Sequence, residues 1–320
     1  MHLKCIVQWE TKNIRQPPAE RGGEQSHLQA SVRVDEMQRP ATCDDHQPVH
    51  APPRTLGIDL AAQPRETAAC LITWGTDGAQ VGLLDAGYSD DALIESIDRT
   101  TPEKVAVDAP FGWPVDFIAA LSAHGAGEPW PDVAIPSLRL RATDLTVISE
   151  TRQQPLSVSS DRIAVTAMRC ARLLTRLKSA GHQVARDGSG TVVEVYPAAA
   201  LRQWSLDPRG YKGTKAEQIA KRSQLVETLL IQWPWLQVTD HERRLMASSD
   251  HLLDALLCAV IARAVVAGKT QPVPSDCREL ASIEGWIHLP VRERLGQFDP
   301  TPQPRSSTAN RGLRSRSPVP

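Results

Sequence analysis

The sequence predicts one α/β domain flanked by two polar ends. Short aliphatic segments typical of buried strands alternate with longer helical segments over residues 55–292. Hydrophobic residues make up 41% of the 320 residues, which is enough for a core, and the 4% of aromatic residues leave aliphatic side chains to fill it. Residues 1–54 and the basic segment 293–320 are polar and rich in Pro, so we expect both ends to be disordered.

An antiparallel meander is predicted at the start of the domain. Three short apolar segments follow one another there, and the turn sequence Gly75-Thr76-Asp77-Gly78 separates the second from the third. They cover residues 55–62, 66–74 and 80–86. A helix over about residues 89–99 follows, and Ser89 or Asp90 is a suitable N-cap for it.

Two more strands and four more helices complete the predicted domain. The strands cover residues 104–110 and 191–197, and each carries an acid. The helices cover residues 115–123, 161–180, 215–233 and 249–267. Residues 285–290 close the domain as a short strand or extended segment.

Acids inside the apolar segments point to a functional site. Asp59, Asp108 and Glu194 each lie inside or at the end of an aliphatic strand, where an unpaired ionised group costs several kcal/mol. Asp254 is a similar anomaly on a helix, because it shares a face with Asp250 and with apolar side chains further along. Each of these acids needs a polar partner or an ion.

Carboxylates that converge at one edge of the sheet would form an all-oxygen site. Such a site suits Mg²⁺ or Mn²⁺, which bind carboxylates and waters in octahedral geometry. Two such metals can activate a water and stabilise the leaving oxygen in phosphodiester hydrolysis. We therefore expect a metal-dependent phosphodiester hydrolase with Mg²⁺ or Mn²⁺ as its cofactor.

Structural roles are an alternative for several of these acids. Asp108 precedes Ala-Pro and could cap a turn, and Asp250 follows two serines and is a natural N-cap. Glu194 could pair with an arginine, for example one of the helix predicted over residues 161–180. The acids of the first strand and of the last long helix lie at neither a cap nor a turn.

Short motifs with charged residues are spread over the predicted domain. They are Gly57-Ile58-Asp59, Val107-Asp108-Ala109-Pro110-Phe111-Gly112, Arg141-Ala142-Thr143-Asp144, Val193-Glu194-Val195-Tyr196-Pro197, Lys212-Gly213-Thr214-Lys215 and Asp250-His251-Leu252-Leu253-Asp254-Ala255. In order and spacing they resemble the domain-of-unknown-function family 429, a family of predicted nucleases with a ribonuclease H-like fold. The resemblance covers about residues 56–290. It implies a five-stranded mixed sheet, its first three strands antiparallel, with flanking helices and a helical insertion.

The resemblance also implies a set of site residues. Position by position it makes Asp59, Asp108, Asp250 and Asp254 the metal ligands, and Glu194 matches a characteristic acid of the family. We therefore expect a catalytic set of the two strand-end aspartates, Glu194 and Asp254. The helix motif is also similar to that of Holliday-junction resolvases of the same superfamily, in which paired helix acids complete the metal site.

Three further residues match the family outside the carboxylate set: Arg141, Asp144 and Lys215. In a site that handles phosphates, Arg141 and Lys215 would bind the nucleic acid or nucleotide substrate, because a guanidinium contacts a phosphate with two hydrogen bonds and an ammonium acts as a point charge. The alternative for Arg141 and Asp144 is a surface ion pair between positions three apart.

Other classes of function are weighed against this expectation. A non-catalytic nucleic-acid or nucleotide-binding protein of the same fold is one alternative. An actin-like or sugar-kinase-like enzyme that uses ATP is the other, although Leu60-Ala61-Ala62 after Asp59 lacks the Gly and Thr of a phosphate loop. The net charge of -1 and the lack of an apolar run of ~18 residues favour a cytoplasmic protein without a membrane span. Six scattered cysteines without a CxxC pair argue against a zinc ribbon or a disulfide framework.

Overall fold

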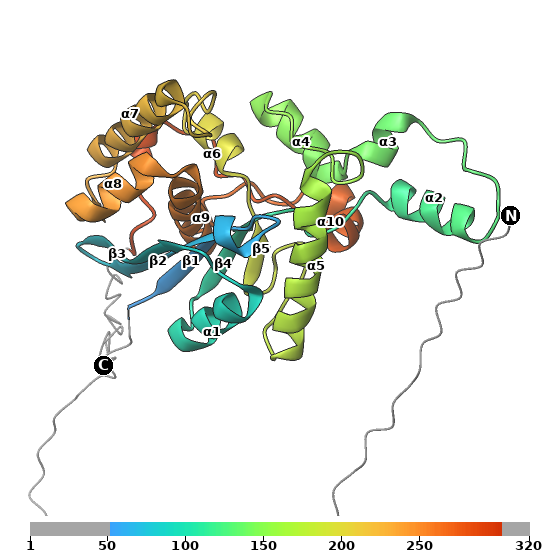
Figure 1. Ribbon diagram of the computed structural model, residues 1–320, viewed down its shortest axis with the longest axis horizontal. Coiled ribbons are helices and arrows are strands. Elements are labelled where there is room, and N and C mark those ends of the chain that lie inside the picture. The colour runs from blue at the N-terminus through green and yellow to red at the C-terminus, as the bar shows by residue number, and fades with distance from the viewer. Residues whose placement is uncertain (1–51, 303–320) are drawn as a thin grey trace, which may run out of the picture. The chain divides into compact units, whose positions relative to one another are not determined.

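A six-stranded mixed sheet forms the centre of the protein in a computed structural model that describes residues 52–302 (Figure 1). The strands are β1 (Arg54–Asp59), β2 (Ala68–Gly75), β3 (Gly78–Ala86), β4 (Lys104–Asp108), β5 (Val192–Glu194) and β6 (Leu236–Gln237). Their order across the sheet is β5-β4-β1-β2-β3-β6. Strands β1, β2 and β3 are antiparallel, as expected, and β4 and β5 run parallel to β1. The expected count of five strands is one too low, because β6 has two residues and too little sequence to form a pattern.

Helices lie on both faces of the sheet and in the long connection between β4 and β5. They are α1 (Asp90–Thr100), α2 (Val115–Gly125), α3 (Ile135–Arg139), α4 (Ala142–Thr151), α5 (Ile163–Ser179), α6 (Pro197–Gln203), α7 (Ala216–Gln232), α8 (Asp240–Ser248), α9 (Asp250–Val266) and α10 (Arg278–Glu284). The helices predicted from periodicity correspond to α1, α2, α5, α7 and α9. Residues 285–290 form isolated bridges rather than a strand: Ile287 pairs with Glu194, and Pro290 pairs with Thr270.

The alternation of side chains along β1 separates two cores. Leu56 and Ile58 pack with α1 and α5 on one face of the sheet. Gly57 lies on the other face, where α9 crosses β1, and a Cβ atom there would come within 2.1 Å of the Ala255 backbone oxygen and 2.2 Å of the Ala259 backbone nitrogen. Glycine therefore allows the backbone of α9 to lie directly against β1.

Helix α9 is buried around almost its whole circumference. Thirteen of its residues are buried, from Leu252 to Ala264, among them Asp254 and Arg263. Ser249 is its N-cap and accepts a hydrogen bond from the Leu252 amide. No single helix within residues 52–302 has the length and apolar character needed to cross a membrane; only α8 and α9 together, bent by 115°, have them.

Aromatic side chains close the end of the domain near β6. Trp233 stacks on Trp235 with ring centroids 5.3 Å apart, and Trp204 contacts both Trp233 and Phe298. Phe298 and Leu295 are buried in this cluster, so the packed core extends past the expected domain end at residue 292. The rest of the expected ends, residues 1–51 and 303–320, lies outside the described residues.

Candidate metal centre

Two of the predicted ligands are neighbours because of strand register. Asp59 ends β1, Asp108 ends β4, and the parallel pairing of these strands places the two aspartates side by side. Neighbouring residues in register point to the same face of a sheet. Both carboxylates therefore lie on the face that α9 covers, at the carboxyl ends of their strands.

Helix α9 brings the third carboxylate to this place. Asp254 lies one turn after the N-terminus of α9 and is almost entirely buried. One carboxylate oxygen from each of Asp59, Asp108 and Asp254 lies within 4.8 Å of the other two. The close contact at Gly57 positions this part of α9, because Ala255 is both its neighbour and the next residue after Asp254.

The donor set fits a hard divalent cation. Mg²⁺ binds oxygen at about 2.1 Å in an octahedron, so its protein ligands lie about 3 to 4.2 Å apart. Three carboxylate oxygens within 4.8 Å reach that arrangement with small side-chain rotations. Asp59, Asp108 and Asp254 are the residues that would hold such an ion.

Burial and mutual repulsion act on the protonation of this cluster. Burial raises the pKa of Asp108 well above its usual range; the Lys212 ammonium opposes this shift, and the carboxylates of Asp59 and Asp254 add to it. The pKa of Asp254 is also raised, first by burial, with Lys212 opposing and Asp59 adding to the effect. The cluster is therefore electrostatically costly without a cation.

Three side chains that sequence reasoning did not select complete the site. The Lys212 ammonium lies 2.5 Å from Oδ2 of Asp254, and the Tyr211 hydroxyl donates a hydrogen bond of 2.6 Å to Oδ1 of the same residue. Nδ1 of His251 lies 2.6 Å from Oδ2 of Asp59. That hydrogen bond raises the pKa of His251, against the effect of its partial burial.

The loop that carries Lys212 is held by its backbone. Asp250, expected as a ligand, is outside the three-carboxylate cluster found among residues 52–302, and its Oδ2 accepts a hydrogen bond of 3.0 Å from the Gly213 amide. The N-cap role proposed for Asp250 belongs to Ser249, one residue earlier. Buried Arg222 donates to the backbone oxygens of Tyr211 and Gly213 at 2.7 and 3.0 Å.

Glu194 points to the opposite face of the sheet from the aspartates. The β4–β5 register pairs it with Val107, whose side chain packs with α1 and α5, whereas Asp108 is the next residue and faces α9. Its carboxylate accepts hydrogen bonds of 2.9 and 2.8 Å from Arg141 and one of 3.0 Å from the Phe111 amide. The structure therefore separates Glu194 from the expected catalytic set and gives it an arginine partner.

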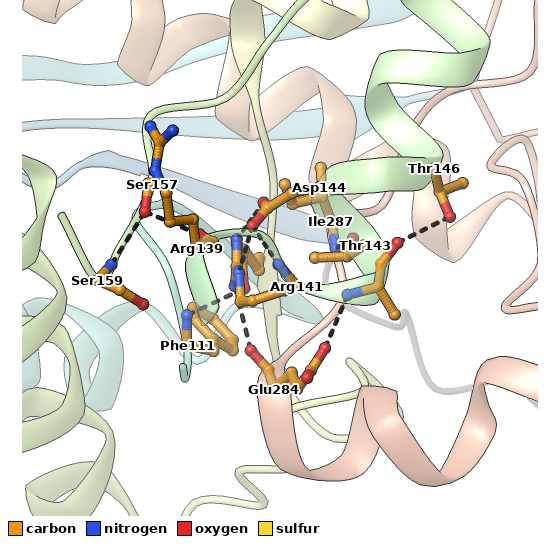
Figure 2. A network of polar contacts seen from close by, with 12 residues as sticks. Phe111, Arg139, Arg141, Thr143, Asp144, Thr146, Ser157, Ser159, Glu284 and Ile287 are labelled. Atoms are coloured by element: carbon orange, nitrogen blue, oxygen red, sulfur yellow. Dashed lines mark hydrogen bonds and ion pairs between the residues drawn. The ribbon is translucent and has the colours of Figure 1, made fainter. Parts of the chain in front are cut away.

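Arg141 is the centre of a buried network rather than part of a surface ion pair (Figure 2). Its five N–H groups all have acceptors: the carboxylates of Asp144 and Glu194, and the backbone oxygen of Glu284. The side chain is 2% exposed, and no N–H group is left for a phosphate. Desolvation opposes its charge, but Glu194 and Asp144 outweigh that and raise the pKa of Arg141.

This network connects four segments of the domain. The Glu284 carboxylate at the end of α10 accepts hydrogen bonds from the amides of Val115 and Ala142, at 2.9 and 2.7 Å. Gly285 follows with φ of 90°, and a Cβ atom there would lie 2.6 Å from the Glu194 carboxylate. The network thus fixes the loop after β4 relative to β5, α4 and α10.

Lys215 lies outside both clusters. It is an exposed residue at the N-terminus of α7, and its backbone amide donates to the Gln218 side chain at 3.0 Å. Of the two lysines in the motif 212–215, the structure therefore places the first, not the second, at the carboxylates. The motif itself was the only signal in the sequence for this loop.

Comparison with known proteins gives one match. A family model described as "Protein of unknown function (DUF429)" matches residues 57–279, a range that contains the three clustered aspartates, Lys212 and the Arg141–Glu194 pair. No curated protein and no solved structure matches the chain.

Proposed function

Because the chain belongs to the DUF429 family and brings three carboxylates together at one sheet edge, we propose that it is a metal-dependent phosphodiester hydrolase of ribonuclease H-like fold. The sheet supports the fold assignment: three antiparallel strands are followed by two strands parallel to the first. The acids lie on its first strand, its fourth strand and its last long helix. The observation that carries the proposal is the convergence of Asp59, Asp108 and Asp254.

The chain's own residues supply binding and orientation in this mechanism. A bound Mg²⁺ or Mn²⁺ would activate water and stabilise the leaving oxygen. Asp59, Asp108 and Asp254 would hold the cation, and the Tyr211 hydroxyl orients the Asp254 carboxylate through its hydrogen bond to Oδ1. His251 orients Asp59 through Nδ1, and its side chain is 40% exposed, so it can exchange protons with solvent.

A substrate with phosphates suits the charges of the site. A divalent ion on three carboxylates leaves a net charge of about -1, and the Lys212 ammonium brings it to about zero, so the repulsion that the bare acids would exert on an anionic substrate is removed. We propose a nucleic acid or a nucleotide as this substrate. One of its phosphate groups would contact both the ion and Lys212.

A cleavage panel tests the proposal. Single strands, duplexes and junctions of DNA, and single and double strands of RNA, are incubated with the protein and Mg²⁺, Mn²⁺ or EDTA. We expect metal-dependent cleavage of at least one substrate, its loss in Asp108→Asn, and full activity in Asp132→Asn, whose side chain lies in an exposed loop. Metal binding without cleavage of any substrate would favour a non-catalytic nucleotide-binding or nucleic-acid-binding protein, and ATP turnover would favour a kinase-like enzyme.

A further inference from the structure

Lys212 occupies the position of a counter-ion for the carboxylate cluster. Its ammonium lies 2.5 Å from Oδ2 of Asp254, and its charge opposes the rise in the pKa of both Asp108 and Asp254. Oδ1 of Asp254 is bonded to Tyr211, so both oxygens of this carboxylate have a partner.

The two partners of Asp254 differ in their compatibility with a divalent ion. The neutral Tyr211 hydroxyl can stay hydrogen-bonded to a carboxylate that also binds a cation. The Lys212 ammonium cannot stay at 2.5 Å without strong repulsion from a doubly charged ion bound by the same carboxylate. The ammonium and the ion therefore compete for Asp254.

The loop allows Lys212 to leave by rotation of its side chain alone. The backbone on either side is fixed: Arg222 binds the carbonyl oxygens of Tyr211 and Gly213, and Asp250 binds the Gly213 amide. The Lys212 side chain is nevertheless 47% exposed on a flexible four-carbon stem, so solvent is open to it.

We propose that Lys212 is the resident counter-cation of this site, that a divalent metal ion displaces it from Asp254, and that the released ammonium then contacts the phosphate of the substrate. Anion binding at this edge of the sheet thereby becomes dependent on the metal. The inference rests on the proposed function in taking a divalent ion as the ligand of the three aspartates.

Metal affinity of lysine variants tests this exchange. Mn²⁺ binding is measured by calorimetry for the full chain, with Lys212→Gln, Lys212→Arg and Lys215→Gln as variants. Loss of the competing ammonium should make Lys212→Gln bind Mn²⁺ at least about tenfold more tightly than wild type. Lys212→Arg keeps a cation at Asp254 and should bind no more tightly than wild type, and the exposed Lys215→Gln should be unchanged.

Thermal melting gives the second readout. Without metal, Lys212→Gln should melt below wild type, because the carboxylates lose their counter-ion, and it should gain more than wild type when Mn²⁺ is added. If Lys212 is purely structural, Lys212→Gln should lower the metal-free melting temperature and leave the Mn²⁺ affinity unchanged or weakened. That result would overturn the counter-cation inference and leave the proposed function standing. If wild type and Lys212→Gln both failed to bind Mn²⁺ or Mg²⁺, the proposed function would fail with it.

Discussion

Asp108→Asn separates a metal centre from a structural cluster by the sign of its effect on stability. Among residues 52–302, the Asp108 carboxylate has no hydrogen-bond or ion-pair partner, whereas Asp59 is bonded to His251 and Asp254 to Lys212. Asparagine keeps the shape of the side chain and removes its charge. The metal-free protein should therefore become more stable, because two repulsive pairs are lost and no bond is broken.

The geometry sets the magnitude of this gain. Two unit charges 4.8 Å apart repel by about 3.5 kcal/mol at an effective dielectric constant near 20. Asp108 faces two such charges, but the Lys212 ammonium offsets one of them, and proton uptake by Asp108 relieves part of the other. We expect a net gain of about 1–3 kcal/mol, or about 2–8 °C in melting temperature for a domain of this size.

Melting curves with EDTA, Mg²⁺ and Mn²⁺ measure the effect, with Asp132→Asn as the control for a lost surface charge. Asp108→Asn should also lose the stabilisation that the metals give wild type. The raised pKa of Asp108 adds a pH test: its contribution to metal-free stability is present below about pH 4 and is lost as the pH rises through that raised pKa, so the variant should show a weaker dependence. A metal-free melting temperature several degrees below wild type, with the metal response retained, would refute the reasoning.

Three other substitutions test the supports of the site. Gly57→Ala should lower the free energy of unfolding in urea by about 3 kcal/mol or more, because the new Cβ meets α9 backbone, while Gly82→Ala, with nothing closer than 3.8 Å, should be nearly neutral. Arg141→Lys should lower the free energy of unfolding by about 1–3 kcal/mol, because buried carboxylate oxygens lose hydrogen-bond donors. It should leave the Mn²⁺ affinity unchanged, and a weaker affinity would place Arg141 in the binding site. The raised pKa of His251 stabilises the metal-free protein below about pH 6.5, and this contribution disappears as the pH rises through that pKa; a titration of stability against pH should lack this step in His251→Gln.

The strand ends could be predicted from the sequence because acids inside aliphatic runs are rare and need a partner. That logic selected Asp59 and Asp108. Asp254 was selected because it lies on a helix and has no cap role there, and the structure brings these three residues together. The α/β class and the antiparallel start followed from turn residues and alternation in the same way.

Register and loop geometry could not be predicted. Glu194, like Asp108, is an acid in an aliphatic strand. The register pairs it with Val107 and so turns it to the opposite face of the sheet. A strand of three residues carries too short a pattern to specify that register. Which of Lys212 and Lys215 reaches the carboxylates depends on how Arg222 anchors the loop before α7. Arg222 does so through the backbone oxygens of Tyr211 and Gly213, and its side chain looks ordinary in the sequence.

The order of the acids along the chain has a consequence for synthesis. His251, on the same helix as Asp254, contacts Asp59 across 192 positions of sequence. A ribosome releases the strands with Asp59 and Asp108 long before α9, so a nascent chain carries the paired strand acids without their third member. Residue 254 must leave the ribosome tunnel before the centre can close, and protection of the nascent chain by Mn²⁺ against protease should begin only with chains that extend beyond α9.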